Sequence, residues 1–219
     1  MQNVTEEGVV AKNAPNILII GDSNAALAHG WVAQLEQLMP LANIVNISQS
    51  GRTIAFDNNG REELNAVKNI GEYLDLAQQQ IGRAQFNYII INLGTNDAKK
   101  DFAAEQAVIP NYFSEMLDHI VLFADDSDVF AKKGKIFFLT PPPMGTKNIA
   151  DKYVGGNKRL GKLIPQLEKI ARQKGFAVIN IFKTLKNSFS TYAPDGVHMN
   201  GDGQRIVAEQ IVAEIGKGS

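Results

Sequence analysis

The stretch NILIIGDSN, residues 16–24, indicates the fold of this chain, because a nearly continuous apolar run ends there in a short polar turn. Similar apolar runs occupy residues 43–47, 88–93, 135–140 and 176–181. Runs that are apolar throughout, rather than alternating, are typical of parallel strands covered on both faces. The sequence therefore predicts a five-stranded parallel sheet.

Helical hydrophobic patterns separate these runs and extend to the end of the chain. They cover residues 25–38, 61–81, 112–123, 157–173 and 203–215. This alternation predicts an α/β fold, a three-layer α/β/α sandwich with right-handed crossovers. Five strands favour the flavodoxin-like order 2-1-3-4-5, which places a ligand crevice beyond the carboxyl ends of the first and third strands.

The 219 residues show no composition break and no linker rich in Pro, Gly or Ser. We therefore predict a single domain over residues 14–219, preceded by a flexible N-terminal lead over residues 1–13. That lead lacks the basic and apolar parts of a signal peptide. The segment QNVTEE after Met1 fits the start of a mature exported chain, which favours the periplasm or the exterior over the cytoplasm and leaves the compartment open.

Composition excludes several classes of function. Twenty-two basic against 23 acidic residues, with no long run of one sign, argue against a nucleic-acid partner. No apolar run approaches the ~18 residues of a membrane span, so no integral membrane contact is expected. Cysteine is absent and the three histidines are scattered, and the G-x-x-x-x-G-K stretch at residues 156–162 lacks the following Ser or Thr. We expect no metal or other cofactor.

Ser23 lies in the turn between the first strand and the helical pattern that begins at residue 25. Its hydroxyl would point into the predicted crevice, where it could act as a nucleophile. The alternative is structural, because Ser and Asn are favoured N-cap residues, so that Ser23 or Asn24 would only cap a helix.

The turns after the second and third strands carry small and amide residues, SQSG at 48–51 and GTND at 94–97. Gly51 allows its backbone N–H to approach a developing oxyanion, and the side chain of Asn96 can supply another donor. The alternative is that Gly51 and Gly94 serve tight turns and that Asn96 caps a helix.

Asp195 and His198 lie three residues apart in the segment DGVH, ahead of the last helical pattern. At this spacing the carboxylate can hold Nδ1 of the ring, which leaves Nε2 to take the proton of Ser23. His29 has no acid three or four residues before it, and His119 follows Glu115 by four residues in a helical segment; both are interpreted as structural.

These segments resemble the sequence blocks of the SGNH hydrolases, also called the GDSL esterase/lipase family. GDSN at residues 21–24 is similar to the first block, although Asn24 replaces the usual leucine. Gly51 stands at the glycine of the second block, Asn96 at the asparagine of the third, and DGVH resembles the fifth. The similarity spans residues 19–200.

The resemblance implies an SGNH-type fold and a Ser23–His198–Asp195 triad. It also implies an oxyanion hole made by the backbone N–H groups of Ser23 and Gly51 and the side chain of Asn96. We further expect weaker substrate contacts from neighbouring residues, namely Asp22, Asn24, Arg52, Thr95 and Val197. Arg52 could instead pair with a local carboxylate such as Asp57.

The predicted function is that of a serine esterase that uses an acyl-enzyme. The loop RTIAFDNNGRE after Gly51 is polar, which suits a small acyl group on a carbohydrate better than a long lipid chain. Phe56, Trp31 and Tyr192 are candidates for stacking on a sugar ring, with core packing as the alternative. Two other functions stay open: a lysophospholipase or thioesterase of the same family, and a non-catalytic flavodoxin-like module that binds a ligand. The sequence indicates no oligomeric state.

Overall fold

The computed structural model describes residues 14–126, 128–147 and 149–217. The predicted N-terminal lead over residues 1–13 lies outside the described residues.

The described residues form a five-stranded sheet in the order β2-β1-β3-β4-β5, and all neighbouring strands are parallel. The predicted sheet and its strand order are therefore confirmed. The strands are β1 (Asn16–Gly21), β2 (Asn43–Asn46), β3 (Phe86–Asn92), β4 (Phe130–Leu139) and β5 (Ala177–Ile179).

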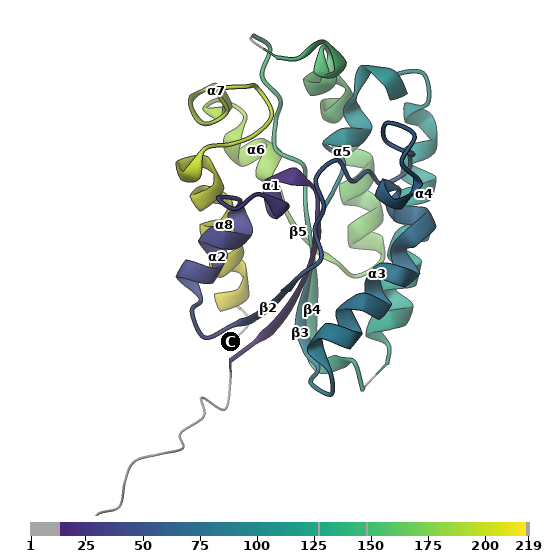
Figure 1. Cartoon of the computed structure of the whole chain (residues 1–219), viewed down its shortest axis with the longest axis vertical. Coiled ribbons are helices and arrows are strands. Elements are labelled where there is room, and N and C mark those ends of the chain that lie inside the picture. The colour runs from purple at the N-terminus through teal and green to yellow at the C-terminus, as the bar shows by residue number, and fades with distance from the viewer. Residues whose placement is uncertain (1–13, 127, 148, 218–219) are drawn as a thin grey trace, which may run out of the picture.

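Helices cover both faces of the sheet (Figure 1). On one face lie α2 (Trp31–Leu38) and α8 (Gly201–Gly216). The other face is covered by α3 (Ala66–Ile81), α4 (Ile109–Ala124) and α5 (Gly156–Gln173). This is the predicted three-layer α/β/α arrangement.

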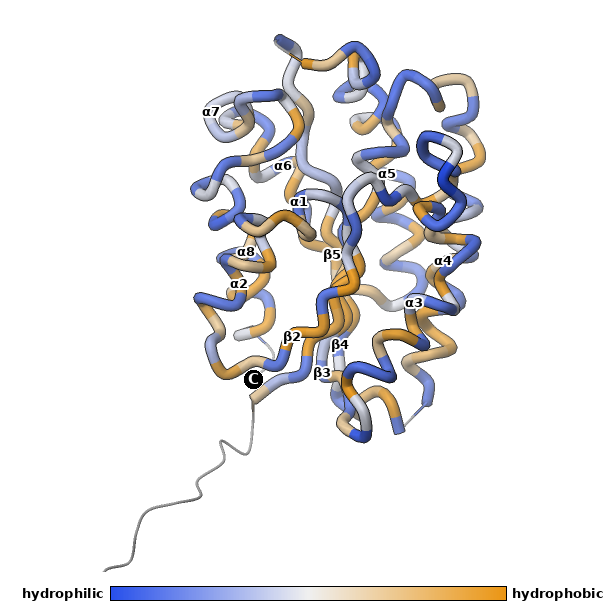
Figure 2. Tube along the Cα trace, in the orientation of Figure 1, coloured by the Kyte–Doolittle hydropathy of each residue, from blue (hydrophilic) through white to orange (hydrophobic). Residues whose placement is uncertain are grey.

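The apolar sequence of strand β1 is explained by its burial on both faces of the sheet. Ile17 and Ile19 pack toward α2 and α8, whereas Leu18 and Ile20 pack toward α3, α4 and α5, and all four are 0% exposed. Burial of such a side chain stabilises the fold by about 1.5–3 kcal/mol. Figure 2 shows the same pattern, with hydrophobic residues concentrated along the strands in the centre.

The prediction of a single helix over residues 25–38 is wrong. The structure has a short α1 (Ser23–Ala26) and then α2, because Leu27 and Gly30 adopt extended backbone conformations. At Gly30 the chain passes so close to itself that a Cβ atom would lie 2.5 Å from the carbonyl oxygen of Asn24. The break keeps α1 to one turn, directly after β1.

Other predicted boundaries also change. Strand β4 begins at Phe130 rather than at residue 135, although its first part is polar and pairs irregularly with β3. Strand β5 ends at Ile179, because the side chain of Asn180 caps α6 (Ile181–Leu185). The sequence patterns also missed α7 and five short 3₁₀ helices among the described residues: α7 (Phe189–Tyr192), Glu62–Leu64, Asn96–Ala98, Lys100–Phe102, Gln106–Val108 and Asp151–Tyr153.

None of the helices in the described parts of the chain is long and apolar enough to cross a membrane.

Candidate active site

Ser23 is the first residue of α1, at the carboxyl end of β1. The N-cap of this helix is Asp22, whose carboxylate accepts the backbone N–H of Asn24 at 3.0 Å. The capping role considered for Ser23 or Asn24 is therefore filled by Asp22. As the first helical residue, Ser23 has a backbone N–H without an acceptor inside the helix, and its hydroxyl is free for another contact.

The structure brings Ser23, His198 and Asp195 together. The Oγ atom of Ser23 lies 3.0 Å from Nε2 of His198, although 175 residues separate them in the chain. On the other side of the ring, Nδ1 lies 2.7 Å from Oδ2 of Asp195. With Nδ1 donating to this carboxylate, Nε2 is left as the acceptor of the Ser23 hydroxyl proton.

Asp195 is held as a carboxylate beneath the ring. Burial would raise its pKa, but hydrogen bonds from the His198 ring and from the backbone N–H groups of His198 and Val197 outweigh burial and lower the pKa. The two backbone bonds measure 2.7 and 2.8 Å. The charge can therefore stabilise an imidazolium that forms when His198 accepts a proton.

Asn24 supports the loop that carries His198. Its side chain is fully buried, and Oδ1 accepts the Gln204 amide at 3.0 Å and the Met199 backbone N–H at 3.4 Å. The expected substrate contact of Asn24 stays a prediction, and the structure shows its polar atoms bonded to the loop that carries His198. Gln204, which sequence reasoning missed, is a polar residue on the otherwise apolar buried side of α8.

The side chain of Asn96 has a fixed orientation. Its Nδ2 donates to the backbone oxygen of Arg52 at 3.0 Å, and its Oδ1 accepts the hydroxyl of Tyr153 at 3.3 Å. One N–H of the amide remains for an additional acceptor. Tyr153 was not anticipated, since nothing near it in the sequence marks it as a partner of a residue 57 positions away.

Gly51 supplies a second backbone donor. Its φ is +88°, a conformation that favours glycine, and within the described residues its N–H has no hydrogen-bond acceptor. The nearby Arg52 carbonyl binds Asn96, so the turns that carry the two residues are in direct contact. The N–H groups of Ser23, Gly51 and Asn96 are donors of the kind that an oxyanion hole requires, and their role in one stays a prediction.

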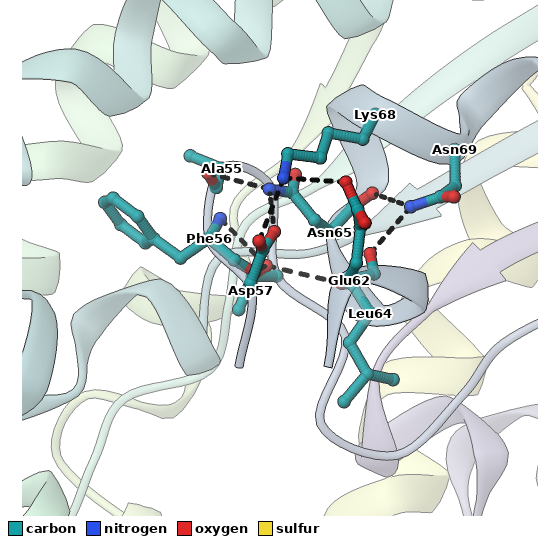
Figure 3. Close-up of polar contacts among 9 residues, drawn as sticks. Ala55, Phe56, Asp57, Glu62, Leu64, Asn65, Lys68 and Asn69 are labelled. Atoms are coloured by element: carbon teal, nitrogen blue, oxygen red, sulfur yellow. Dashed lines mark hydrogen bonds and ion pairs between the residues drawn. The ribbon is translucent and has the colours of Figure 1, made fainter. Parts of the chain in front are cut away.

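The substrate contact expected for Arg52 stays a prediction, and the structure shows other partners for its side chain. Its side chain is buried, donates to the Ile47 carbonyl at 2.6 Å, and lies 3.8 Å from the ring centroid of Tyr73. The alternative pairing with Asp57 is wrong, because that carboxylate binds Lys68 and Asn65 (Figure 3). Through its hydrogen bond to the Ile47 carbonyl, Arg52 stabilises the turn next to Gly51.

Three further residues expected to contact substrate are buried, and their substrate contacts stay predictions. Asp22 is 1% exposed and Thr95 2% exposed. Burial raises the pKa of Asp22, against the opposing effect of the Asn24 N–H and the Thr95 hydroxyl. Val197 is buried in an apolar cluster with Met144.

The three aromatic candidates for sugar stacking pack inside the protein. The indole N–H of Trp31 donates to Oδ1 of Asn92 at 3.2 Å, and Phe56 stacks on Phe102 at 4.3 Å between ring centroids. Tyr192 packs against the apolar layer between the sheet and α8. Core packing, the alternative, is therefore the role that their surroundings support.

Asp97 connects the turn after β3 to the loop after Gly51. Its carboxylate accepts the backbone N–H of Ile54 at 2.9 Å and that of Ala55 at 3.0 Å. Burial raises the pKa of Asp97 to about 7, although these backbone donors oppose the shift. The folded protein therefore binds a proton here more tightly than the unfolded chain does.

We expect Asp97→Asn to remove part of the pH dependence of stability. Because the folded pKa is raised, the contribution of Asp97 to the free energy of unfolding falls as pH rises from about 4 to about 7. The asparagine keeps an oxygen acceptor and cannot ionise. Urea denaturation across this range should show the wild type losing stability relative to the variant as pH rises. Asp101→Asn, at an exposed position, is the control; a pH-independent difference between Asp97→Asn and wild type would contradict the prediction.

Within the described residues, no group of three or more His, Cys, Asp or Glu side chains is arranged to hold a metal ion.

Known proteins share this fold. Est24, a carbohydrate acetylesterase from Sinorhizobium meliloti, has a TM-score of 0.70 at 19% identity, and the match covers 91% of this chain and 99% of that one. The inhibitor-bound aryl esterase of M. smegmatis has a TM-score of 0.70 at 20% identity, with the same coverage of 91% and 99%. At these identities the likeness concerns the fold.

A curated relative is an acetylxylan esterase from Xylanibacter ruminicola. It is 29% identical over 143 residues, a match that covers 58% of this chain and 28% of the relative. This chain therefore matches well under two thirds of that protein's length.

The model of the GDSL-like lipase/acylhydrolase family matches residues 19–206. That range is most of the chain and contains the whole candidate site: Ser23, Gly51, Asn96, Asp195 and His198. The chain belongs to the GDSL-like lipase/acylhydrolase family.

Proposed function

We propose that this protein is a serine esterase that hydrolyses carboxylic esters through an acyl-enzyme. The observation that carries the proposal is the continuous contact from Ser23 through His198 to Asp195, with distances of 3.0 and 2.7 Å. A hydroxyl that faces the acceptor nitrogen of an oriented imidazole is the arrangement that activates serine as a nucleophile.

In the first half of the reaction, Oγ of Ser23 attacks the ester carbonyl carbon while Nε2 of His198 takes the hydroxyl proton. The negative charge moves to the carbonyl oxygen, which the N–H groups of Ser23, Gly51 and Asn96 stabilise. The tetrahedral intermediate collapses, the C–O bond to the alcohol breaks, and His198 returns the proton to the leaving alcohol.

In the second half, water replaces the alcohol. His198 removes a proton from the water as it attacks the acyl carbon of the Ser23 ester. Collapse of the second intermediate releases the carboxylic acid and returns the proton to Oγ of Ser23. Asp195 stays ionised throughout and stabilises the imidazolium in both halves.

We propose that the substrate is a carbohydrate that carries small acyl groups, above all acetyl. The names of the acetylxylan esterase and of the carbohydrate acetylesterase support this choice. A groove of about 300 Å³ lies beside the loop that carries His198, where the Gly145 N–H donates to the Gly196 carbonyl at 2.8 Å, although no triad residue lines it. Its lining consists of Gly145, Thr146, Ile149, Val154, Gly155, Asn157 and Lys158.

A series of p-nitrophenyl esters from acetyl to palmitoyl tests this choice. We expect kcat/KM to be highest for acetyl and to fall at least roughly 10-fold by the longest chains, because the loop RTIAFDNNGRE after Gly51 is polar and suits a long apolar acyl group poorly. Acetate release from acetylated xylan and from sugar acetates is the companion assay, with Ser23→Ala as the background control. Activity that rises with chain length would instead favour the lysophospholipase or thioesterase alternative.

The non-catalytic alternative is a ligand-binding module that uses the same crevice. A binding module has no need of a base directed at a serine, so the Ser23–His198 contact favours the esterase. Binding of acetylated sugars without any acetate release would favour the module.

A further inference from the structure

Lys99 is an unusually buried lysine beside the candidate oxyanion donors. It is 2% exposed, and its ammonium donates to Oδ1 of Asn58 at 2.6 Å. Within the described residues it forms no ion pair with a carboxylate. Burial lowers the pKa of Lys99, so placing this ammonium here is unfavourable by itself. Such a residue is retained where it performs a specific task.

Asn58 connects Lys99 to Gly51 through two hydrogen bonds. Its Nδ2 donates to the Gly51 carbonyl at 2.6 Å, and the Asn58 side chain is itself 1% exposed. A cation on the amide oxygen polarises the amide and strengthens its N–H as a donor. The result is a buried chain of two hydrogen bonds that starts at Lys99 and ends on the backbone of Gly51.

The backbone of Gly51 depends on the contact with Asn58 because a glycine is less restricted in conformation than any other residue type. Glycine rotates freely about φ and ψ, so its N–H has no preferred direction of its own. The Asn58 amide fixes the adjoining carbonyl and also packs over the Cα atom, since a Cβ built there would lie 3.2 Å from Nδ2. Both contacts restrict the backbone whose N–H we assign to the oxyanion hole.

Lys99 is one of four residues in segment 96–102 that hold the loop over residues 52–58. The Asn96 side chain donates to the Arg52 carbonyl, and the Asp97 carboxylate accepts the backbone N–H groups of Ile54 and Ala55. Phe102 stacks on Phe56, and Lys99 binds Asn58. The ammonium also lies 5.7 Å from the ring centroid of Tyr153, whose hydroxyl binds Asn96. Lys99 therefore lies next to Asn58, which binds Gly51, and next to Tyr153, which binds Asn96.

The opposite side of the loop offers a comparison. There Lys68 binds Asp57 and Glu62, both at 2.9 Å, in an exposed cluster at the start of α3 (Figure 3). Exposed ion pairs are screened by solvent and contribute little to stability, and this one has no contact with Gly51. Two lysines thus bind side chains of one loop, and only the buried one is linked, through Asn58, to Gly51.

We propose that Lys99, through Asn58, is a positioning residue that aims the Gly51 N–H at the oxyanion. This inference rests on the proposed esterase function. The donor acts on the tetrahedral intermediate more strongly than on bound substrate, so loss of its aim lowers kcat and leaves KM nearly unchanged.

Lys99→Met keeps the length of the side chain and removes the ammonium. We expect kcat for p-nitrophenyl acetate to fall about 10-fold, less than the 10²-fold to 10³-fold loss typical when an oxyanion donor is deleted. KM should stay within about 2-fold, and the inhibition constant of a boronic acid that forms a tetrahedral adduct on Ser23 should rise in step with the loss of kcat. Lys99→Arg, which restores a cationic donor, should recover part of the rate.

Lys68→Met is the matched control and should keep the wild-type kcat. Wild-type kcat in Lys99→Met, or an equal change in KM, would overturn the inference. If Lys99→Met does not fold, Asn58→Asp decides, because it keeps an acceptor for Lys99 and loses the donor to Gly51: a lower kcat supports the inference, and an unchanged kcat overturns it. Failure of the esterase function itself is distinct, since wild type and Ser23→Ala would then have equal rates.

Discussion

Ser23→Ala is expected to lower kcat for p-nitrophenyl acetate by roughly 10⁶-fold, to the level left by the oxyanion donors and binding alone. The variant removes the only atom that we expect to form the covalent acyl intermediate. Its Oγ lies 3.0 Å from the acceptor nitrogen of His198, and the N-cap of α1 belongs to Asp22, so little of the helix depends on the Ser23 side chain. The fold should therefore survive the change.

The control for this variant is Ser190→Ala, an exposed serine in α7. It loses a hydroxyl of the same kind and should keep the wild-type rate. Circular dichroism and a urea midpoint would establish that Ser23→Ala remains folded. Retention of substantial activity in folded Ser23→Ala would contradict the proposed mechanism.

His198→Gln should lower kcat by roughly 10⁴-fold to 10⁶-fold, because Ser23 then lacks a base that can take its proton. Glutamine can reach the same position and form hydrogen bonds, but it cannot accept and return a proton. Steady-state turnover of the same ester measures the effect. His119→Gln, at an exposed position on α4, is the matched control and should behave as wild type.

The losses of kcat caused by Ser23→Ala and by His198→Gln should not add in the double variant. Ser23 and His198 act as one unit, so the double variant is expected to be no slower than Ser23→Ala alone. An additive loss would indicate that the two residues act in separate steps, contrary to the proposal.

The fold could be predicted from the sequence because its signal is local and repeated. Strand β1, in the interior of the sheet, is buried on both faces, so its residues are nearly all apolar. The pairing of Asp195 with His198 is also local, since three residues separate them. The contact between His198 and Ser23 could be inferred only through the expected topology and the family resemblance.

The supports of the site could not be predicted, because they join residues far apart in the sequence. Lys99 meets Asn58 across 41 residues, and Asn24 meets Gln204 across 180. A charged or amide residue in a turn predicts exposure on average, so the burial of Arg52 and Asn24 could not be predicted from the sequence. In the structure Arg52 donates to the Ile47 carbonyl and to Oε1 of Gln49, and Asn24 accepts the Gln204 amide.

The central claim, that Ser23 is a nucleophile activated by His198, is tested most directly by covalent labelling with a fluorophosphonate, followed by mass measurement of the intact protein and of its peptides. We predict one adduct per chain, located on Ser23, with none in Ser23→Ala and much slower formation in His198→Gln. An active wild-type protein that gains no adduct, or that carries it on a different residue, would contradict the account.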